Sequence, residues 1–277
     1  MGRSDFENYY SEIFKERWDK LRDSLNHSHR ICFSVNEPNT SVLNFPQPIE
    51  KSTIPRNEKN LLQYYILDPA SVLIARALPL TANSKVLDMC AAPGGKSLVL
   101  ISRLSSDSEI ILNEVSPGRR EALIKVIQNY VPLNERESRI WVRGQDGVQF
   151  GLRSPNSFDS ILLDAPCSGE AHILENKSEM DVWSKKRTQG LSIKQYSLLS
   201  SAWSAVKSGG SILYSTCTLS PLENDEVIRK LIKRKKDEVE ILKPDLELVP
   251  EWTEFGFQYL PDKCGMGPLY GCLIKKK

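Results

Sequence analysis

From residue 85 onward, short apolar runs alternate with amphipathic helical segments, and no other feature of the chain constrains its fold as strongly. An apolar run too short for a helix is typical of a strand that is buried on both faces. Strands that alternate with helices predict an α/β fold with a mostly parallel sheet. The expected strands lie at residues 86–89, 109–112, 140–142, 158–163 and 211–214, and the expected helices at 97–104, 117–130, 191–206 and 221–235.

Capping patterns indicate where several helices begin. Asp68-Pro69 predicts one start, because Asp is a good N-cap and Pro fits the first helical position. Ser116-Pro117 predicts another, and Ser220-Pro221-Leu222-Glu223 has the pattern of a capping box. Residues 256–260 and 269–274 predict antiparallel edge strands.

The first 65 residues differ from the rest. Apolar side chains recur at spacings of three and four between Phe6 and Leu21, which predicts an amphipathic helix. Residues 26–60 are rich in Asn, Ser, Pro and Thr and predict a linker or small irregular unit. We therefore expect a helical and irregular extension over residues 1–65 and an α/β domain over residues 66–277.

Composition excludes several protein classes. The 277 residues are 26% charged and 40% hydrophobic, which excludes a disordered or collagen-like chain. No apolar run approaches ~18 residues, so no membrane-spanning helix is expected, and the first residues lack a signal pattern. Six well-separated cysteines predict a reduced, intracellular protein, and three histidines leave little material for a zinc site, so no metal is expected.

A Gly-rich loop predicts a ligand site. The stretch VLDMCAAPGGKS, residues 86–97, passes from an expected strand through a turn into an expected helix. Small residues let a ligand approach the backbone, and a helix start offers free amide groups. The stretch matches a P-loop only at its end, because Cys90 stands where the first Gly belongs. A P-loop or dinucleotide enzyme, or a purely structural turn, stays as an alternative.

Carboxylates follow successive expected strands. They are Asp88, Glu114, Asp146 and Asp164. Open α/β sheets bind ligands at this edge, and Glu114 lies about 20 residues after Gly95, a spacing at which an acid grips ribose hydroxyls. The plainer interpretation is an acid that favours the next helix start. These four carboxylates are accompanied by one cation, Lys96. A site that is acidic overall fits a cationic, adenosine-containing cofactor such as S-adenosylmethionine.

Two cysteines follow expected strands at the same edge. Cys167 ends Asp164-Ala165-Pro166-Cys167, and Cys217 ends Ser215-Thr216-Cys217. A single cysteine is most often an inert buried thiol. Two thiols beside a carboxylate suggest instead methylation of a pyrimidine at C5. In that chemistry a thiolate adds at C6, a carboxyl group stabilises N3 and a base removes the C5 proton.

Four stretches of the chain carry a resemblance to a known family. They are VLDMCAAPGGKS, NEVSPGRREAL, FDSILLDAPCSG and SGGSILYSTCTLSPLENDEV, within residues 67–228, with weaker similarity in the final GPLY. Together they resemble the Sun-type (Fmu/Sun, NOL/NOP/Sun-domain) RNA cytosine-C5 methyltransferases. The resemblance implies a Rossmann-like S-adenosylmethionine-dependent methyltransferase fold, with a mostly parallel seven-stranded sheet and a short helical N-terminal extension.

The resemblance also implies site residues. It gives Cys217 the role of nucleophile and Cys167 that of adduct release, with Asp164 near base N3 and Lys96 near the reacting centre. Glu170-Ala171-His172 departs from the usual pattern after Cys167. The implied cofactor contacts are Cys90, Ala91, Ala92, Pro93, Gly94, Gly95, Lys96, Glu114, Arg119, Asp146, Gly147 and Asp164.

The implied partner is RNA, either rRNA or tRNA, with an unstacked cytosine. Residues 1–65 and the basic run Lys185-Lys186-Arg187 are candidate RNA contacts, and Trp183 could either stack on a base or pack in the core. A protein partner that delivers the substrate stays open, and so does the choice between cytoplasm, mitochondrion and nucleolus. The alternative function is a methyltransferase-fold RNA-binding protein in ribosome assembly, with little or no turnover.

Overall fold

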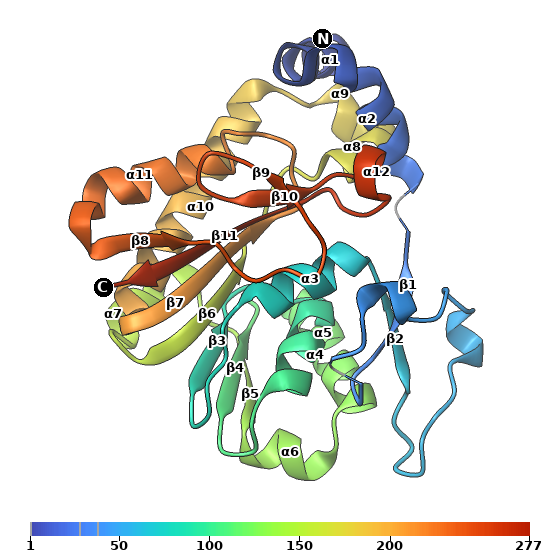
Figure 1. The fold of residues 1–277 in the computed structure, drawn as a ribbon, viewed down its shortest axis with the longest axis vertical. Coiled ribbons are helices and arrows are strands. Elements are labelled where there is room, and N and C mark those ends of the chain that lie inside the picture. The colour runs from blue at the N-terminus through green and yellow to red at the C-terminus, as the bar shows by residue number, and fades with distance from the viewer. Residues whose placement is uncertain (1, 28, 38) are drawn as a thin grey trace.

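The computed structural model describes residues 2–27, 29–37 and 39–277, and a nine-stranded sheet forms its centre (Figure 1). The strands of this sheet are β3 (Lys85–Asp88), β4 (Glu109–Asn113), β5 (Ile140–Arg143), β6 (Phe158–Asp164), β7 (Val206–Thr216), β8 (Val239–Leu242), β9 (Glu251–Trp252), β10 (Phe257–Tyr259) and β11 (Leu269–Lys276). A separate pair consists of β1 (Ile31–Ser34) and β2 (Tyr64–Leu67). The helices are α1 (Gly2–Phe14), α2 (Trp18–Ser24), α3 (Pro69–Ala77), α4 (Gly95–Arg103), α5 (Pro117–Tyr130), α6 (Leu133–Ser138), α7 (Phe150–Arg153), α8 (Glu170–Glu175), α9 (Lys177–Asp181), α10 (Lys185–Ala205), α11 (Asp225–Lys235) and α12 (Pro261–Cys264).

The sheet has a parallel part and an antiparallel part. Strands β5, β4, β3, β6 and β7 are neighbours in that order and run parallel. Strand β11 runs antiparallel to β7, and its two ends pair with β10 and β8. The α/β fold class is confirmed, but the expected number of seven strands is wrong. Strands β8 and β9 add to the count, and they are too short and too exposed to give an alternating apolar signal.

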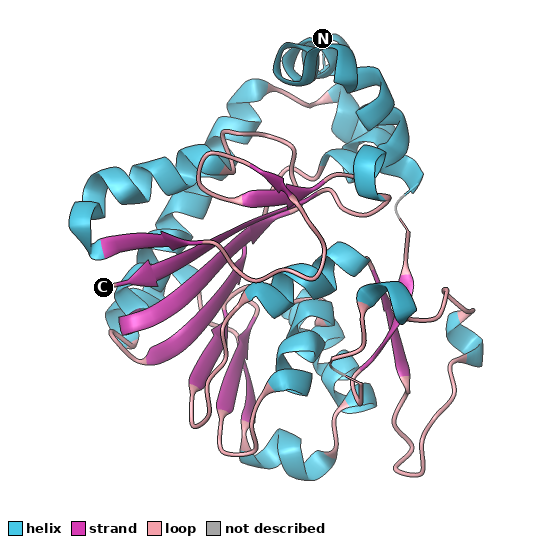
Figure 2. Cartoon of the chain, in the orientation of Figure 1, coloured by secondary structure: helices cyan, strands magenta, loops and turns pink. Residues whose placement is uncertain are grey.

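Helices cover both faces of the sheet, as Figure 2 shows. On β3, Val86 packs into the core beneath α3, α4 and α5, whereas Leu87 packs into the core beneath α7, α10 and α11. On β6, Leu162 and Ile161 divide in the same way between the two cores. Because successive strand side chains point to opposite faces, this burial on both sides explains the unbroken apolar runs of the sequence.

The N-terminal helices pack against α8, α9, α10 and α12 rather than standing apart. Phe6, Tyr10 and Trp18 share an apolar core with side chains of α8 and α9 and with the buried Trp183. In Figure 1 these helices lie beside α8, α9 and α12. The expected division at residue 65 falls within β2, which pairs along its whole length with β1. Trp183 is 3% exposed, so of the two interpretations it packs in the core rather than being available to stack on a base.

Two of the three expected helix starts match the structure. Asp68 accepts a hydrogen bond from Ala70 N at 2.7 Å, and Ser116 is the N-cap of α5. The predicted capping box is wrong, because α11 begins only at Asp225 and Glu223 is fully buried. Glu223 instead binds groups from other parts of the chain, which compete with the local cap. Among the described residues, no helix has the length and apolar character to cross a membrane.

Candidate active site

The Gly-rich loop, residues 90–96, joins β3 to α4 and is called the cofactor loop below. Gly94 is the N-cap of α4 and has a φ of 115°, a conformation that residues with a Cβ rarely adopt. A Cβ on Gly94 would lie 3.0 Å from Val126, and one on Gly95 would lie 3.0 Å from Tyr65. The two glycines therefore let the loop pass closely between α5 and β2.

A cavity of about 250 Å³ opens beside the cofactor loop. All seven residues of the loop line it, together with Asp164 at the end of β6. Arg30, Tyr65 and Asp68 also line the cavity, and sequence analysis did not assign them to the site. Asp68 had a sequence signal as an N-cap, whereas Arg30 and Tyr65 reach the cavity only through the pairing of β1 with β2.

Asp88 places an acceptor at the base of this cavity. Its carboxylate is 1% exposed, and Oδ2 accepts a hydrogen bond from Ser97 Oγ at 2.7 Å. Among the described residues, Oδ1 has no hydrogen bond of normal geometry. Burial raises the pKa of Asp88 to about 7, against the lowering by Ser97. A buried carboxylate oxygen with room for a donor suits a cationic ligand, so this acceptor fits the ammonium group of S-adenosylmethionine.

The other expected cofactor residues lie outside the lining of this cavity and form an adjoining edge. Glu114 is 3% exposed, accepts a hydrogen bond from Ser116 N at 2.9 Å and lies 3.5 Å from Arg119. Arg119 donates to Ala92 O at 2.7 Å and thereby holds the cofactor loop. The exposed Asp146 accepts from Val148 N, so it caps the turn that contains Gly147.

Lys96 connects the cofactor loop to the end of β6. Its Nζ lies 2.8 Å from Asp164 Oδ2, and the two side chains are 14% and 28% exposed. Burial alone lowers the pKa of Lys96, but the charges of Asp164 and of a Cys217 thiolate outweigh that effect and leave the pKa raised. Lys96, Asp164 and Cys217 therefore belong to one electrostatic environment.

The two cysteines after β6 and β7 come together, as their positions after adjacent strands predict. Cys167 Sγ lies 3.0 Å from Cys217 Sγ, and Cys217 N donates to Cys167 Sγ at 3.2 Å. Cys217 is exposed, whereas Cys167 is partly covered. The hydrogen bond with Cys217 raises the pKa of Cys167 strongly, with burial as a second cause. The two thiols are thus in contact but differ in their exposure to solvent.

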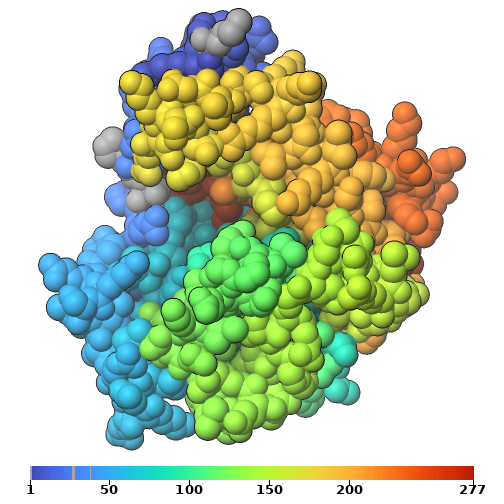
Figure 3. Space-filling model, turned by 180° about the vertical axis from the view of Figure 1, so that it is seen from behind, coloured from blue at the N-terminus to red at the C-terminus, as the bar shows by residue number. Residues whose placement is uncertain are grey.

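The surface is hollowed beside the segment that follows Cys167. Figure 3 shows the hollow between the segment that contains α8 and α9, coloured yellow, and the segment that contains α5, coloured green. Two of the three basic residues expected to contact RNA at the start of α10 interact with other side chains of the protein. Arg187 pairs with Glu179 at 2.6 Å, and Lys185 lies over the ring of Tyr9. Lys186 is exposed.

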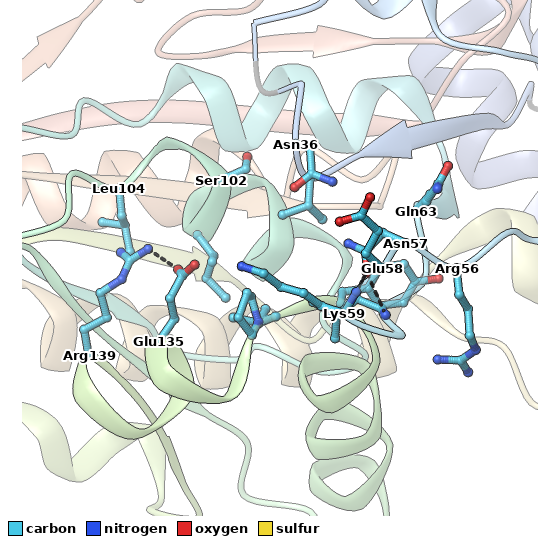
Figure 4. A pocket seen from close by; sticks show the side chains of 16 residues that line it. Asn36, Arg56, Asn57, Glu58, Lys59, Gln63, Ser102, Leu104, Glu135 and Arg139 are labelled. Carbon is cyan, nitrogen blue, oxygen red and sulfur yellow. Dashed lines mark hydrogen bonds and ion pairs between the residues drawn. The ribbon is translucent and has the colours of Figure 1, made fainter.

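A larger cavity, of about 640 Å³, lies at the other end of α4 (Figure 4). Lys59 extends into it, while Arg139 is paired with Glu135 and Arg56 donates to Asn60 O. Cofactor-loop residues do not contribute to its lining. Its mixed charges and its place at the opposite end of the helix separate it from the two thiols.

The chain is similar in sequence to known RNA methyltransferases. The family model described as 16S rRNA methyltransferase RsmB/F matches residues 75–274. A mitochondrial tRNA (cytosine(34)-C(5))-methyltransferase from Danio rerio is 34% identical over 244 residues, which cover 83% of this chain and 65% of that protein. The 5-cytosine rRNA methyltransferase NSUN4 from Xenopus laevis is 34% identical over 255 residues, or 90% of this chain and 60% of that protein.

A solved structure shares the fold. A methyltransferase homolog protein from Pyrococcus horikoshii superimposes with a TM-score of 0.77 at 23% identity, covering 97% of this chain and 93% of that one. The chain spans 41 to 65% of the length of the curated relatives it matches. The resemblance to Sun-type proteins is confirmed by the family match, and the chain belongs to the 16S rRNA methyltransferase RsmB/F family.

Proposed function

We propose that this protein is an S-adenosylmethionine-dependent RNA methyltransferase that forms 5-methylcytosine through a covalent cysteine adduct. The observation that carries the proposal is the contact of two thiols, Cys167 and Cys217, at 3.0 Å. They follow neighbouring parallel strands at the edge that also holds the Lys96–Asp164 pair. One thiol can attack a pyrimidine while the other stands beside it for the release step.

The cofactor loop would hold the cofactor, with Gly94 and Gly95 allowing close approach and the unpaired Oδ1 of Asp88 accepting from its ammonium group. Glu114 would accept from the ribose hydroxyls, and Arg119, Asp146 and Gly147 would complete the binding edge. When bound, S-adenosylmethionine supplies an electrophilic methyl group, which is transferred with loss of the sulfonium charge.

In the proposed reaction the exposed Cys217 gives its thiol proton to water, and its sulfur forms a bond to C6 of cytosine. The electrons of the C5–C6 double bond move to C5 as N3 takes up a proton, and the N3–H then donates to the carboxylate of Asp164, which Lys96 orients. N3 gives this proton up again once C5 is methylated. After methylation a base removes the C5 proton, and the double bond re-forms as the bond between C6 and Cys217 breaks. We assign Cys167 to this release, because its sulfur touches that of Cys217.

The substrate is proposed to be rRNA or tRNA. One similar protein is named for mitochondrial tRNA and another for rRNA, which supports both classes and makes a mitochondrial location the first one to test. The hollow of Figure 3 borders the segment with α8, which starts three residues after Cys167, and would receive an unstacked cytosine. Residues 1–65 are proposed as an extension of the catalytic part, and a substrate-delivering protein partner stays open.

The test uses tritiated S-adenosylmethionine and total RNA that lacks 5-methylcytosine. It compares the wild type with Cys217→Ala, Cys167→Ala and the control Cys264→Ala, whose thiol bonds to Leu260 O away from the site. We expect no transfer by Cys217→Ala and a denaturation-resistant protein–RNA adduct with Cys167→Ala. The opposite pattern would exchange the two roles. Cofactor binding without transfer to any RNA would favour the assembly-factor alternative.

A further inference from the structure

A fully buried carboxylate joins the two loops that carry the cysteines. Glu170 is 0% exposed and stands at the start of α8. It accepts hydrogen bonds from Ser168 Oγ at 2.6 Å, from Thr218 Oγ1 at 2.8 Å and from Leu219 N at 2.7 Å. Ser168 directly follows Cys167, and Thr218 directly follows Cys217. One side chain therefore holds both loops immediately beside their thiols.

A second buried carboxylate fixes the Cys167 loop from the opposite side. Glu223 accepts from Ser168 N at 3.1 Å and from Gln195 Nε2 at 2.7 Å, and its Oε1 lies 2.7 Å from Ser168 Oγ, so Glu170 and Glu223 share the single proton of that hydroxyl. Gln195 Nε2 also donates to Pro166 O at 2.9 Å. The residues before and after Cys167 are thus both tied to the same network. Glu170 and Glu223 are together called the carboxylate bridge.

The N-terminal helix α1 gives Glu170 one more hydrogen-bond donor. Tyr10 on α1 is 0% exposed, and its hydroxyl donates to Glu170. The ring is stacked on Trp18 with centroids 5.1 Å apart, so its position is set by packing of the N-terminal helices. The extension therefore reaches the catalytic loops through a hydrogen bond.

Stability alone does not account for these two acids. Burying a carboxylate costs free energy unless donors surround it, and apolar side chains of similar volume often stabilise a core as well or better. A buried polar network does, however, specify one arrangement of the groups that it joins, because each unmade hydrogen bond costs about 1–3 kcal/mol. Here the groups that it joins are the two cysteine loops.

We propose that Glu170 is a positioning residue that, with Glu223, sets the spacing between the thiols of Cys167 and Cys217. The adduct formed by one cysteine then stays within reach of the other. This rests on the proposed function for its catalytic meaning, whereas the spacing itself can be measured without RNA.

The first test measures the thiol spacing chemically. Diamide oxidises two adjacent thiols to a disulfide, and its azo bond takes up the two hydrogen atoms. Peptide mapping of the full chain then gives the rate of the Cys167–Cys217 cross-link. We expect Glu170→Ala to slow it about tenfold, because the loops lose their common acceptor. Glu170→Gln should slow it less than Glu170→Ala, since its amide oxygen can still accept from the hydroxyls of Ser168 and Thr218, while its NH2 group cannot accept from Leu219 N.

The matched control is Asp262→Ala. The Asp262 side chain is also buried, at 2% exposure, and also receives a residue of the N-terminal segment, Arg17, at 2.6 Å, but it does not contact the cysteine loops. A wild-type cross-linking rate in folded Glu170→Ala, or equal slowing by Asp262→Ala, would overturn the proposal. If Glu170→Ala does not fold, Thr218→Val removes one bridging hydroxyl, and an unchanged rate in that variant would overturn it too.

The second test follows methyl transfer. For Glu170→Ala we expect kcat to fall about tenfold with KM for RNA unchanged, and the protein–RNA adduct to persist longer than in the wild type. A raised KM with normal kcat would place Glu170 in RNA binding and overturn the positioning role. If the wild type transfers no methyl group, the proposed function fails, while the cross-linking rates still decide whether the bridge sets the spacing.

Discussion

The cofactor loop and the cysteine loops lie at one edge of the sheet, yet they are held by different kinds of contact. In the cofactor region, Ser97 and Asp88 are 9 positions apart in the chain, within one strand–loop–helix unit. In the cysteine region, Glu170 binds Thr218 and Tyr10, which are 48 and 160 positions away. A ligand loop can thus be encoded locally, whereas the contacts that we propose to set the spacing of the two thiols join residues far apart in the chain.

The largest effect is expected where the two regions meet, at Lys96. Lys96→Met removes the cation 2.8 Å from Asp164 and leaves this carboxylate without its ion pair. On the proposed mechanism, Asp164 then loses its orientation toward base N3, and kcat should fall about 100-fold. Single-turnover methyl transfer at saturating RNA and cofactor measures this loss directly.

The control for that comparison is Lys85→Met at the other end of β3. Lys85 also pairs with a carboxylate, Glu109, at 2.9 Å, but it lies away from the thiols. Its removal should leave kcat within about twofold of the wild type, because an exposed ion pair contributes little. Similar losses in both variants would mean that Lys96 acts through stability alone.

A second substitution should lower cofactor affinity without changing the spacing of the two thiols. Gly94→Ala places a Cβ 3.0 Å from Val126 at a φ of 115°, which strains the cofactor loop by about 2 kcal/mol. We expect cofactor affinity to fall about 30-fold, with the diamide cross-link of Cys167 and Cys217 unchanged. Calorimetric titration with S-adenosylmethionine measures the first effect. Gly118→Ala, at a position with open space around it, serves as the control.

The same contrast explains which parts of the site could be predicted from the sequence. The apolar runs and the stretch from Val86 to Ser97 encode the parallel strands and the cofactor loop through local patterns, and both were predicted. Strand ends also brought Cys167 and Cys217 to one edge. Glu223 was predicted to cap a helix, because the local pattern could not reveal that Ser168 and Gln195 would bind it. Likewise, the cavity wall from Arg30 and Tyr65 depends on a strand pair that no short-range signal specifies.

A third prediction concerns the pH dependence of the carboxylate bridge. Burial raises the pKa of Glu223 from 4.5 to about 7, with Glu170 contributing in the same direction. Between these values the unfolded chain has lost the proton that the folded chain retains, so the wild type loses stability as pH rises from about 5 to 7. The glutamine of Glu223→Gln does not titrate. The free energy of unfolding of this variant should therefore fall by about 1–2 kcal/mol less than that of the wild type between pH 5 and 7.

Urea unfolding at pH 5, 6, 7 and 8 measures the difference between the two proteins. Tyr9 and Cys167 also lie close to Glu223, but burial raises the pKa of Tyr9, and that of Cys167 is raised mainly by its bond to Cys217, so neither should titrate in this range. Glu121→Gln, which replaces an exposed acid on α5, should follow the wild type. If Glu223→Gln and the wild type show the same pH dependence, Glu223 is already ionised in the folded protein, and the bridge carries its full negative charge.

The smallest effect is expected at the point where the N-terminal helix touches the cysteine region. Tyr10→Phe removes the hydroxyl that donates to Glu170 but keeps the ring stacked on Trp18. Glu170 retains its donors from Ser168, Thr218 and Leu219, so the free energy of unfolding should fall by about 1 kcal/mol. The cross-linking rate of the thiols should change less than in Thr218→Val, because Tyr10 does not belong to either cysteine loop. A larger change in Tyr10→Phe than in Thr218→Val would show that the spacing of the thiols is set from the N-terminal helix.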